Sequence, residues 1–302
     1  MQSEERRALM GIVAAVVVGV GVAAAGSQGS ELVLGLPFFG LVVGLVYVVQ
    51  WVAFIPAFMT QSERFFDITG SITYVSVTTI AVLLSPVKDG RSVLLMAAVL
   101  VWAVRLGTFL FTRVQKEGKD GRFDELKPSF LRFLLVWTLQ GLWVTFTASA
   151  ALVGITTQVR RPLGIAALVG FVAWLIGMAV EVAADTQKSR FRADPANRGR
   201  FISTGVWAWS RHPNYFGEIV LWLGVAIIAA PVLRGWQWVA MVSPVFVTVL
   251  LTRISGVPML EQRADERWGG QVDYEAYKAR TPVLVPLPRA LRRGERGPGH
   301  VP

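Results

Sequence analysis

Several side chains capable of binding and chemistry gather in one short stretch, residues 202–224, which reads ISTGVWAWSRHPNYFGEIVLWLG. Arg211 and His212 precede Pro213, and a proline is tolerated in the first turn of a helix. The stretch therefore predicts a helix N-terminus, where free backbone N–H groups bind phosphate. An arginine beside them can hold a phosphate through two parallel hydrogen bonds. We expect a site for a phosphate-bearing cofactor here.

The same predicted helix carries polar groups on into an apolar segment. Asn214, Tyr215 and Glu218 follow the proline, and such groups within a membrane helix usually face a cavity, a partner or a site. Trp207 precedes them, with a flat surface suited either to a ring or to the bilayer interface. His212 is one of two histidines in a chain without cysteine, so we expect no metal site.

A row of ionisable residues lies upstream of this stretch. Glu181, Asp185, Lys188 and Arg192 recur at spacings of four, three and four, which places them on one helix face. Part of the pattern is explained by pairing between successive turns, worth only about 0.3–0.5 kcal/mol per pair. The arginines that follow, Arg200 among them, favour a cofactor pocket that opens to the cytoplasm.

Two further groups lie outside this region. Asp67 and Tyr74 are seven residues apart, on the same helix face two turns from each other. A functional pair and a salt bridge with an N-cap from Asp67 or Thr69 are both compatible with this spacing. Near the C-terminus, Glu261 and Asp265 belong to a polar run. We interpret that run either as an amphipathic helix along the inner membrane face or as a lid over the cofactor.

The elements that must position these residues are membrane helices. Of the 302 residues, 53% are hydrophobic and 17% are charged, whereas about 25% are charged in ordinary soluble domains. Apolar runs of spanning length, ~20 residues each, occur at 8–25, 33–58, 69–86, 92–112, 131–153, 163–184, 213–231 and 236–252. The sequence therefore predicts an all-α, polytopic membrane helix bundle of about eight transmembrane helices. The first run also has features of a signal peptide, because Arg6 and Arg7 precede it.

Basic residues set the expected orientation. Most of the 30 lysines and arginines fall in the segments before the first, third, fifth and seventh runs and after the eighth. By the positive-inside rule, both termini are cytoplasmic. The net charge of +10 then reflects topology, and we expect no nucleic-acid partner. No organelle retention signal is evident, so we expect a multi-pass protein of a bacterial inner (plasma) membrane.

The quoted motifs carry a family resemblance. The segments ADTQKSRF (184–191), TGVWAWSRHPNYFGE (204–218) and LEQRADERWGGQVDYEAYKARTPVLVP (260–286) resemble the DUF1295 branch of the steroid 5-alpha-reductase-like membrane enzymes. The likeness is best over about 180–286 and extends more loosely to FFDITGSITY near the third run. The RHPxYxG core is shared with isoprenylcysteine carboxyl methyltransferases, but Asn214, Glu218 and Asp185 resemble the reductases more closely.

The resemblance implies reduction of a carbon–carbon double bond in a steroid, sterol or other lipid by hydride transfer from NADPH. It also implies the cofactor-binding residues Asp185, Lys188, Arg192, Arg200, Arg211, Asn214, Tyr215 and Glu218, with Glu261 and Asp265 closing over them. On this basis we divide the chain into residues 1–180, which form the lipid-substrate cavity, residues 181–286, which bind the cofactor, and a basic disordered tail at 287–302.

Such a reduction needs a proton donor as well as a hydride. A tyrosine in an apolar cavity stays neutral and donates a strong hydrogen bond to a conjugated ketone. Tyr74 is the first choice, with Asp67 or Glu181 as its partner. Two alternatives remain: an S-adenosylmethionine-dependent methyltransferase of the isoprenylcysteine type, and a non-catalytic lipid transporter. Expected partners are the lipid substrate and membrane lipids, and the oligomeric state is not indicated by the sequence.

Overall fold

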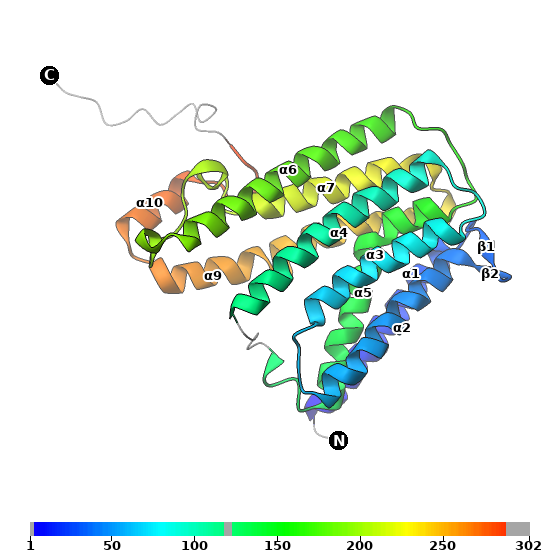
Figure 1. Cartoon of the computed structure of the whole chain (residues 1–302), viewed down its shortest axis with the longest axis horizontal. Helices are drawn as coiled ribbons and strands as arrows, with labels where there is room; N and C mark the ends of the chain where they lie inside the picture. Colours follow the sequence, from blue (N-terminus) through cyan, green and yellow to red (C-terminus); the bar gives the residue numbers. More distant parts are fainter. Residues whose placement is uncertain (1–2, 118–122, 288–302) are drawn as a thin grey trace. The chain divides into compact units, whose positions relative to one another are not determined.

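Long helices make up most of the protein (Figure 1). The computed structural model describes residues 3–117 and 123–287. Within that part, eight segments are long and apolar enough to cross a membrane. Seven of them are formed by α1 (Ser3–Gly26), α2 (Phe38–Met59), α3 (Phe66–Leu84), α4 (Gly90–Glu117), α5 (Phe130–Thr156), α6 (Ile165–Ala193) and α7 (Pro213–Ala229). The predicted all-α, polytopic class is confirmed, and the protein has the character of a multi-pass membrane protein. The orientation of its termini stays a prediction.

The eighth segment, Gly235–Trp268, is less regular than predicted. In place of one helix over 236–252, the chain forms the 3-10 helix η5 (Gly235–Met241), α8 (Val242–Val249), a π-helical turn η6 (Leu250–Ile254) and α9 (Val257–Trp268). The π turn closes with a bond from the Ser255 amide to the Leu250 carbonyl at 2.9 Å. A Cβ at Gly256 would overlap the backbone of Leu251, so this break between helices requires glycine.

Two predicted helix starts are wrong for local reasons. The second helix begins at Phe38 because a hairpin of β1 (Leu32–Val33) and β2 (Leu36–Pro37) occupies the residues before it. The third begins at Phe66, with Phe65 as an N-cap that makes no side-chain hydrogen bond. Neither predicted cap is therefore correct. Asp67 lies inside the first turn, where its charge favours the helix dipole, and Thr69 donates to the Phe65 carbonyl at 2.7 Å.

The chain divides into two units, Met1–Phe171 with Leu223–Phe246, and Val172–Trp222 with Val247–Pro302. In the first unit, α5 is the central helix: α1 and α2 pack against it, and α3 packs against α4 (Figure 1). Residues 147–156 of α5 are all buried. Their polar groups are satisfied locally, as where Ser149 donates to the Ala240 carbonyl at 2.9 Å. The packing of α1 on α5 is consistent with a membrane span at 8–25.

The second unit contains the C-terminal part of α6, the start of α7, the helices α9 and α10 (Val272–Arg280), and the loop between α6 and α7. Gly177 of α6 and Gly217 of α7 allow close backbone approach, because a Cβ on either would lie about 2.5 Å from a backbone atom of the other helix. The boundary at residue 181 stays a prediction. The predicted disordered tail, apart from Leu287, lies outside the described residues.

Candidate nucleotide-binding pocket

The helix α6 extends nine residues past its predicted end, from 184 to Ala193. This continuation places Lys188 and Arg192 on the helix face that also carries Glu181 and Asp185, as the spacing predicts. The following loop returns to the same helix. The Trp207 indole N–H donates to the Ala184 carbonyl at 3.0 Å.

A glycine makes this return possible. Gly205 has φ +61, and a Cβ there would overlap the Gln187 side chain, whose Oε1 accepts from the Val206 amide at 3.0 Å. A glycine at this position thus allows the loop to pass close to α6 and bring Trp207 against it.

The residues just before α7 are held by the C-terminal segment. The amides of Arg211 and His212 donate to the carbonyls of Pro282 and Val283 at 2.9 and 3.1 Å. Ser210 Oγ donates to the Leu284 carbonyl at 2.7 Å. As predicted, α7 begins at Pro213. Backbone pairing therefore fixes Arg211 and His212 independently of any ligand.

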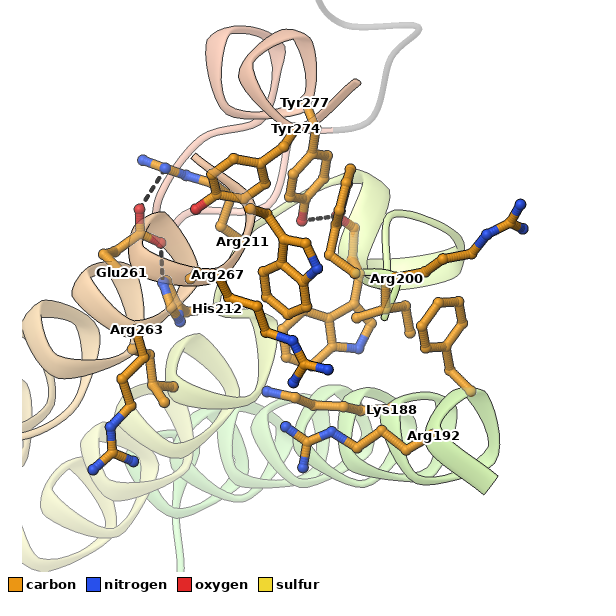
Figure 2. Close-up of a pocket in the computed structure, with 17 residues that line it drawn as sticks. Lys188, Arg192, Arg200, Arg211, His212, Glu261, Arg263, Arg267, Tyr274 and Tyr277 are labelled. Atoms are coloured by element: carbon orange, nitrogen blue, oxygen red, sulfur yellow. Dashed lines mark hydrogen bonds and ion pairs between the residues drawn. The ribbon is translucent and has the colours of Figure 1, made fainter. Parts of the chain in front are cut away.

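These segments surround a cavity of about 300 Å³, drawn in Figure 2. Among the described residues that line it, six are cationic and one, Glu261, is acidic. The cationic residues are Lys188, Arg192, Arg200, Arg211, Arg263 and Arg267. The aromatic ones, besides His212, are Phe191, Phe201, Trp207, Trp268, Tyr274 and Tyr277. Positive charge combined with ring surfaces is suited to an anionic ligand that contains an aromatic ring.

Glu261 joins α9 to the start of α7. One of its carboxylate oxygens accepts from Arg211 Nη1, and the other lies 2.6 Å from His212 Nε2 (Figure 2). Arg192, Arg200, Arg263 and Arg267 make no ion pair with an acidic side chain in the described part of the chain. Glu261 thus neutralises one corner of the pocket and leaves the remaining arginines available to a ligand.

Aromatic rings pack beside several of these cations. Lys188 Nζ lies 4.6 Å from the centroid of the Trp207 ring, and the Arg267 guanidinium carbon lies 5.0 Å from the Trp268 ring. Phe201 contacts Trp268 edge-on, with centroids 5.9 Å apart. The first two distances lie within the range of attraction between a cation and a ring.

The pocket brings together seven of the residues predicted from the sequence to bind the cofactor: Lys188, Arg192, Arg200, Trp207, Arg211, His212 and Glu261. The others do not line it. Asn214 Nδ2 donates to Asp185 Oδ1 at 3.3 Å, and the Tyr215 ring stacks on His212 with centroids 5.7 Å apart. Glu218 is half-buried on α7.

Asp265 does not line the cavity and supports α10 instead. Its Oδ1 accepts from the Tyr274 hydroxyl at 2.8 Å and from Lys278 Nζ at 2.7 Å. Since Tyr274 lines the pocket, Asp265 contributes to the pocket by holding the Tyr274 side chain.

The predicted catalytic residues are divided between the units. Asp67 and Tyr74 lie on α3 of the first unit, where the Tyr74 ring contacts Trp102 edge-on at 5.1 Å. Glu181 lies on α6 of the second unit and is buried. Their roles in catalysis stay predictions.

The sequence-based site omitted Arg263, Arg267 and Trp268, which line the pocket together with Leu260 and Ala264. A signal for them existed: positions 260, 263, 264, 267 and 268 follow the spacing of one helix face. That face carries two arginines and a tryptophan, which the amphipathic interpretation of the run assigned to the membrane surface.

The wall of the pocket predicts a loss of stability at alkaline pH. Burial raises the pKa of the Tyr277 phenol above its ordinary value near 10, and its hydroxyl donates to the Trp207 carbonyl at 2.8 Å. The folded state therefore holds this proton at a pH where the unfolded chain releases it. The contribution of Tyr277 to the free energy of unfolding is complete below about pH 10, and it is lost as the pH rises further.

Thermal unfolding in detergent between pH 7 and 11 measures this effect. We expect Tyr277→Phe to lower the unfolding temperature at pH 7, through loss of one hydrogen bond worth about 1 kcal/mol. We also expect a shallower decline above pH 10 than in the wild type. An unchanged alkaline slope in this variant would contradict the assignment.

The fold and this pocket define a class: a multi-pass, all-α membrane protein with a basic, aromatic-lined pocket in its second unit. The family model described as "Protein of unknown function (DUF1295)" matches residues 53–281. The chain belongs to this family, which confirms the DUF1295 membership expected from its motifs, while the likeness to steroid reductases stays a prediction. No curated protein and no solved structure matches the chain.

Proposed function

We propose that this protein is a membrane reductase that uses NADPH to reduce a carbon–carbon double bond of a steroid, sterol or other lipid. The observation that carries the proposal is the composition of the pocket wall. Six cationic side chains and one acidic side chain are found among its described lining residues, together with aromatic rings. A phosphorylated dinucleotide supplies both matching features, negative charge for the cations and flat rings for the aromatic side chains.

The residues fit such a cofactor by their chemistry. Lys188 provides hydrogen-bond donors for phosphate oxygens, as do the lining arginines that make no ion pair with an acidic side chain in the described residues. Trp207 and Trp268 provide ring faces. We assign Asp185 and Asn214, bonded to each other at 3.3 Å, to the nicotinamide side, since the Oδ1 atom of Asn214 is buried without a hydrogen bond and can accept one from a carboxamide.

The reaction adds two hydrogens to the lipid. When bound, NADPH supplies one of them as a hydride to the electrophilic carbon of the double bond. We propose that Tyr74 donates a hydrogen bond and then a proton, which polarises a ketone conjugated to that bond. Asp67, on the same face of α3, or Glu181 is the proposed partner that orients the phenol. An apolar surrounding keeps water from the reaction.

The same chemistry argues against the methyltransferase alternative. S-adenosylmethionine carries a sulfonium and an ammonium cation, a single carboxylate and no phosphate, so a predominantly cationic wall matches its charge less well than the charge of a phosphorylated dinucleotide. No observation favours a non-catalytic lipid transporter. The proposed setting is the inner membrane of a bacterium, with the lipid substrate drawn from that membrane.

Calorimetric titration of the detergent-purified protein tests the proposal. We expect saturable binding of NADPH and none of S-adenosylmethionine. Lys188→Gln should weaken NADPH binding about tenfold, since a hydrogen bond between charged groups contributes roughly 1.5–3 kcal/mol. Arg198→Gln removes an exposed charge that does not line the pocket and should bind NADPH as the wild type does.

Binding of S-adenosylmethionine without NADPH would overturn the reductase assignment and favour a methyl transfer. If the wild type and Lys188→Gln bind NADPH with equal affinity, this pocket is not the NADPH site.

A further inference from the structure

The short hairpin between α1 and α2 is apolar on both of its faces. Leu32 of β1 is paired with Pro37 of β2, and Val33 is paired with Leu36. Leu32 and Leu36 are more than half exposed, and Leu34 at the turn is 94% exposed. An antiparallel hairpin in water normally alternates, with polar side chains on the face that the protein does not cover. This hairpin has no such polar face.

The turn of the hairpin places a leucine where its backbone is unfavourable. Leu34 and Gly35 have φ +53 and +76, and two positive φ values in a two-residue loop define a type I′ turn. Asn or Asp before Gly is the preferred sequence for this turn, because a side chain such as leucine rarely adopts positive φ. A backbone outlier of this kind points to a function for the side chain that occupies it.

The base of the hairpin is held firmly by the helices of the first unit. The Glu31 amide donates to the Thr156 carbonyl of α5 at 2.7 Å, and the Phe38 amide donates to the Glu31 carbonyl at 2.8 Å. The Glu31 carboxylate forms an ion pair with Arg160 and accepts from Ser85 Oγ at 2.6 Å, and its side chain is buried. The apolar tip therefore projects from a fixed base.

Two exposed tryptophans lie near this base. Trp236 and Trp238 of η5 are exposed, and Gln237 between them is buried. Gln237 accepts from Thr157 Oγ1 at 3.2 Å, and its side-chain nitrogen would lie 3.6 Å from a Cβ at Gly29. Tryptophan is enriched where a membrane meets water. The base of the hairpin is thus at the level expected for the membrane interface, and in Figure 1 the hairpin projects from the ends of α1 and α2.

Lipid is the partner that fits a hairpin of this composition. The hairpin joins two segments of spanning length directly, and residues 32–58 include no charged side chain. Exposed apolar surface marks a contact with a protein or with a membrane. A protein partner would cover one face of a two-stranded hairpin and leave the other in water, whereas lipid surrounds both faces and the tip. Apolar side chains on both faces therefore favour lipid.

We propose that the hairpin inserts into the lipid leaflet at its end of the bundle, with Leu34 at the boundary between headgroups and acyl chains and Leu32 and Leu36 beside it. The predicted orientation makes this the outer leaflet. Because the base of the hairpin is bonded to α5 and to the residues around Arg160, the inserted tip anchors the ends of α1 and α2 at a fixed depth. This inference does not depend on the proposed reductase function.

The test is the depth of the hairpin in vesicles of phosphatidylethanolamine and phosphatidylglycerol. Because the chain has no cysteine, Leu34→Cys takes a single fluorescent nitrobenzoxadiazole label in the full-length protein. We expect a nitroxide near the top of the lipid acyl chain to quench most of this fluorescence, and iodide in the water to quench little of it. The matched control is Lys88→Cys, an exposed residue of the loop before α4, where the two quenchers should have the reverse effect.

A second variant tests whether the leucine at the turn causes insertion. With the label moved to Leu36→Cys, Leu34→Asp creates the Asp-Gly sequence that a type I′ turn prefers, so the turn itself is kept. A carboxylate is costly within a bilayer, and we expect the label to lose most of its quenching by lipid nitroxide and to become accessible to iodide. Leu34→Met keeps an apolar side chain and should leave the quenching as it is with leucine.

Three outcomes would overturn the proposal. If iodide quenches the label at residue 34 as strongly as the label at residue 88, the hairpin lies in water. If neither quencher reaches residue 34, a second copy of the chain or another protein covers the hairpin in place of lipid. If Leu34→Asp and Leu34→Met leave the label at residue 36 equally quenched by lipid nitroxide, the leucine does not hold the hairpin in the leaflet.

Discussion

Gly217→Val is expected to destabilise the protein by at least about 3 kcal/mol, at the upper end of the usual cost of overpacking. A Cβ at this position would lie 2.6 Å from the Gly177 carbonyl oxygen and 2.7 Å from the Glu181 amide nitrogen. Both obstacles are backbone atoms of α6, which cannot rotate away as a flexible side chain can. The helices must separate, and close packing between them is lost.

The consequence extends to the candidate site. Gly217 lies one turn after Pro213, where α7 begins, and next to Glu218. Displacement of this turn moves Asn214 away from Asp185, with which it shares a hydrogen bond at 3.3 Å. We therefore expect weaker NADPH binding as well as a lower unfolding temperature.

Thermal unfolding of the purified protein, followed by the loss of monodisperse material in size-exclusion chromatography, measures the effect. The matched control is Gly21→Val in α1, where a Cβ meets nothing within 4 Å. It should unfold within a few degrees of the wild type, since surface substitutions usually change stability by less than about 0.5 kcal/mol. If the two variants are equally stable, the close approach of α6 and α7 is wrong.

Glu261→Gln is expected to lower stability by about 2 kcal/mol and to loosen α9, through loss of hydrogen bonds between charged groups. The carboxylate contacts both Arg211 and His212, and its side chain is only 23% exposed. An amide cannot neutralise Arg211 and presents a donor where an acceptor is needed. Since α9 also carries Arg267, we expect NADPH affinity to fall in parallel.

A double-mutant cycle isolates this contact. The unfolding free energies of Glu261→Gln, Arg211→Gln and the double variant should give a coupling of at least about 1 kcal/mol. The control is Glu266→Gln on the same helix. The Glu266 carboxylate accepts a hydrogen bond from Gln262 at 2.9 Å on the exposed side of α9, so this substitution removes a charge without breaking a buried contact. Additive effects of the two substitutions would show that the ion pair does not hold α9.

The polar face of α6 shows which part of the site can be predicted from local sequence. The spacing of Glu181, Asp185, Lys188 and Arg192 predicts one helix face, and the structure confirms a helix through all four residues. Periodicity suffices here because residues on one helix are placed by the geometry of its backbone. The proline before Asn214 likewise predicts the start of α7 correctly.

Other features depend on residues distant in the sequence. The direction of Arg267 toward Lys188 and Arg192 (Figure 2) joins segments more than seventy residues apart. Nothing in the local pattern distinguishes Arg267 from Arg263, which has the same charge and lies on the same helix. The bond between Asp185 and Asn214 and the contact of Glu261 with His212 also require the folded chain.

By itself, the sequence determined the membrane class, the approximate positions of the eight segments and the helix faces that carry charge. These properties depend on the transfer of apolar segments from water into the bilayer and on the periodicity of a helix, both of which are local to one segment. Only the tertiary structure decided that cations from α6, α9 and the loop between α6 and α7 line one pocket. That outcome depends on contacts between distant segments, whose energies the order of residues along one segment does not contain.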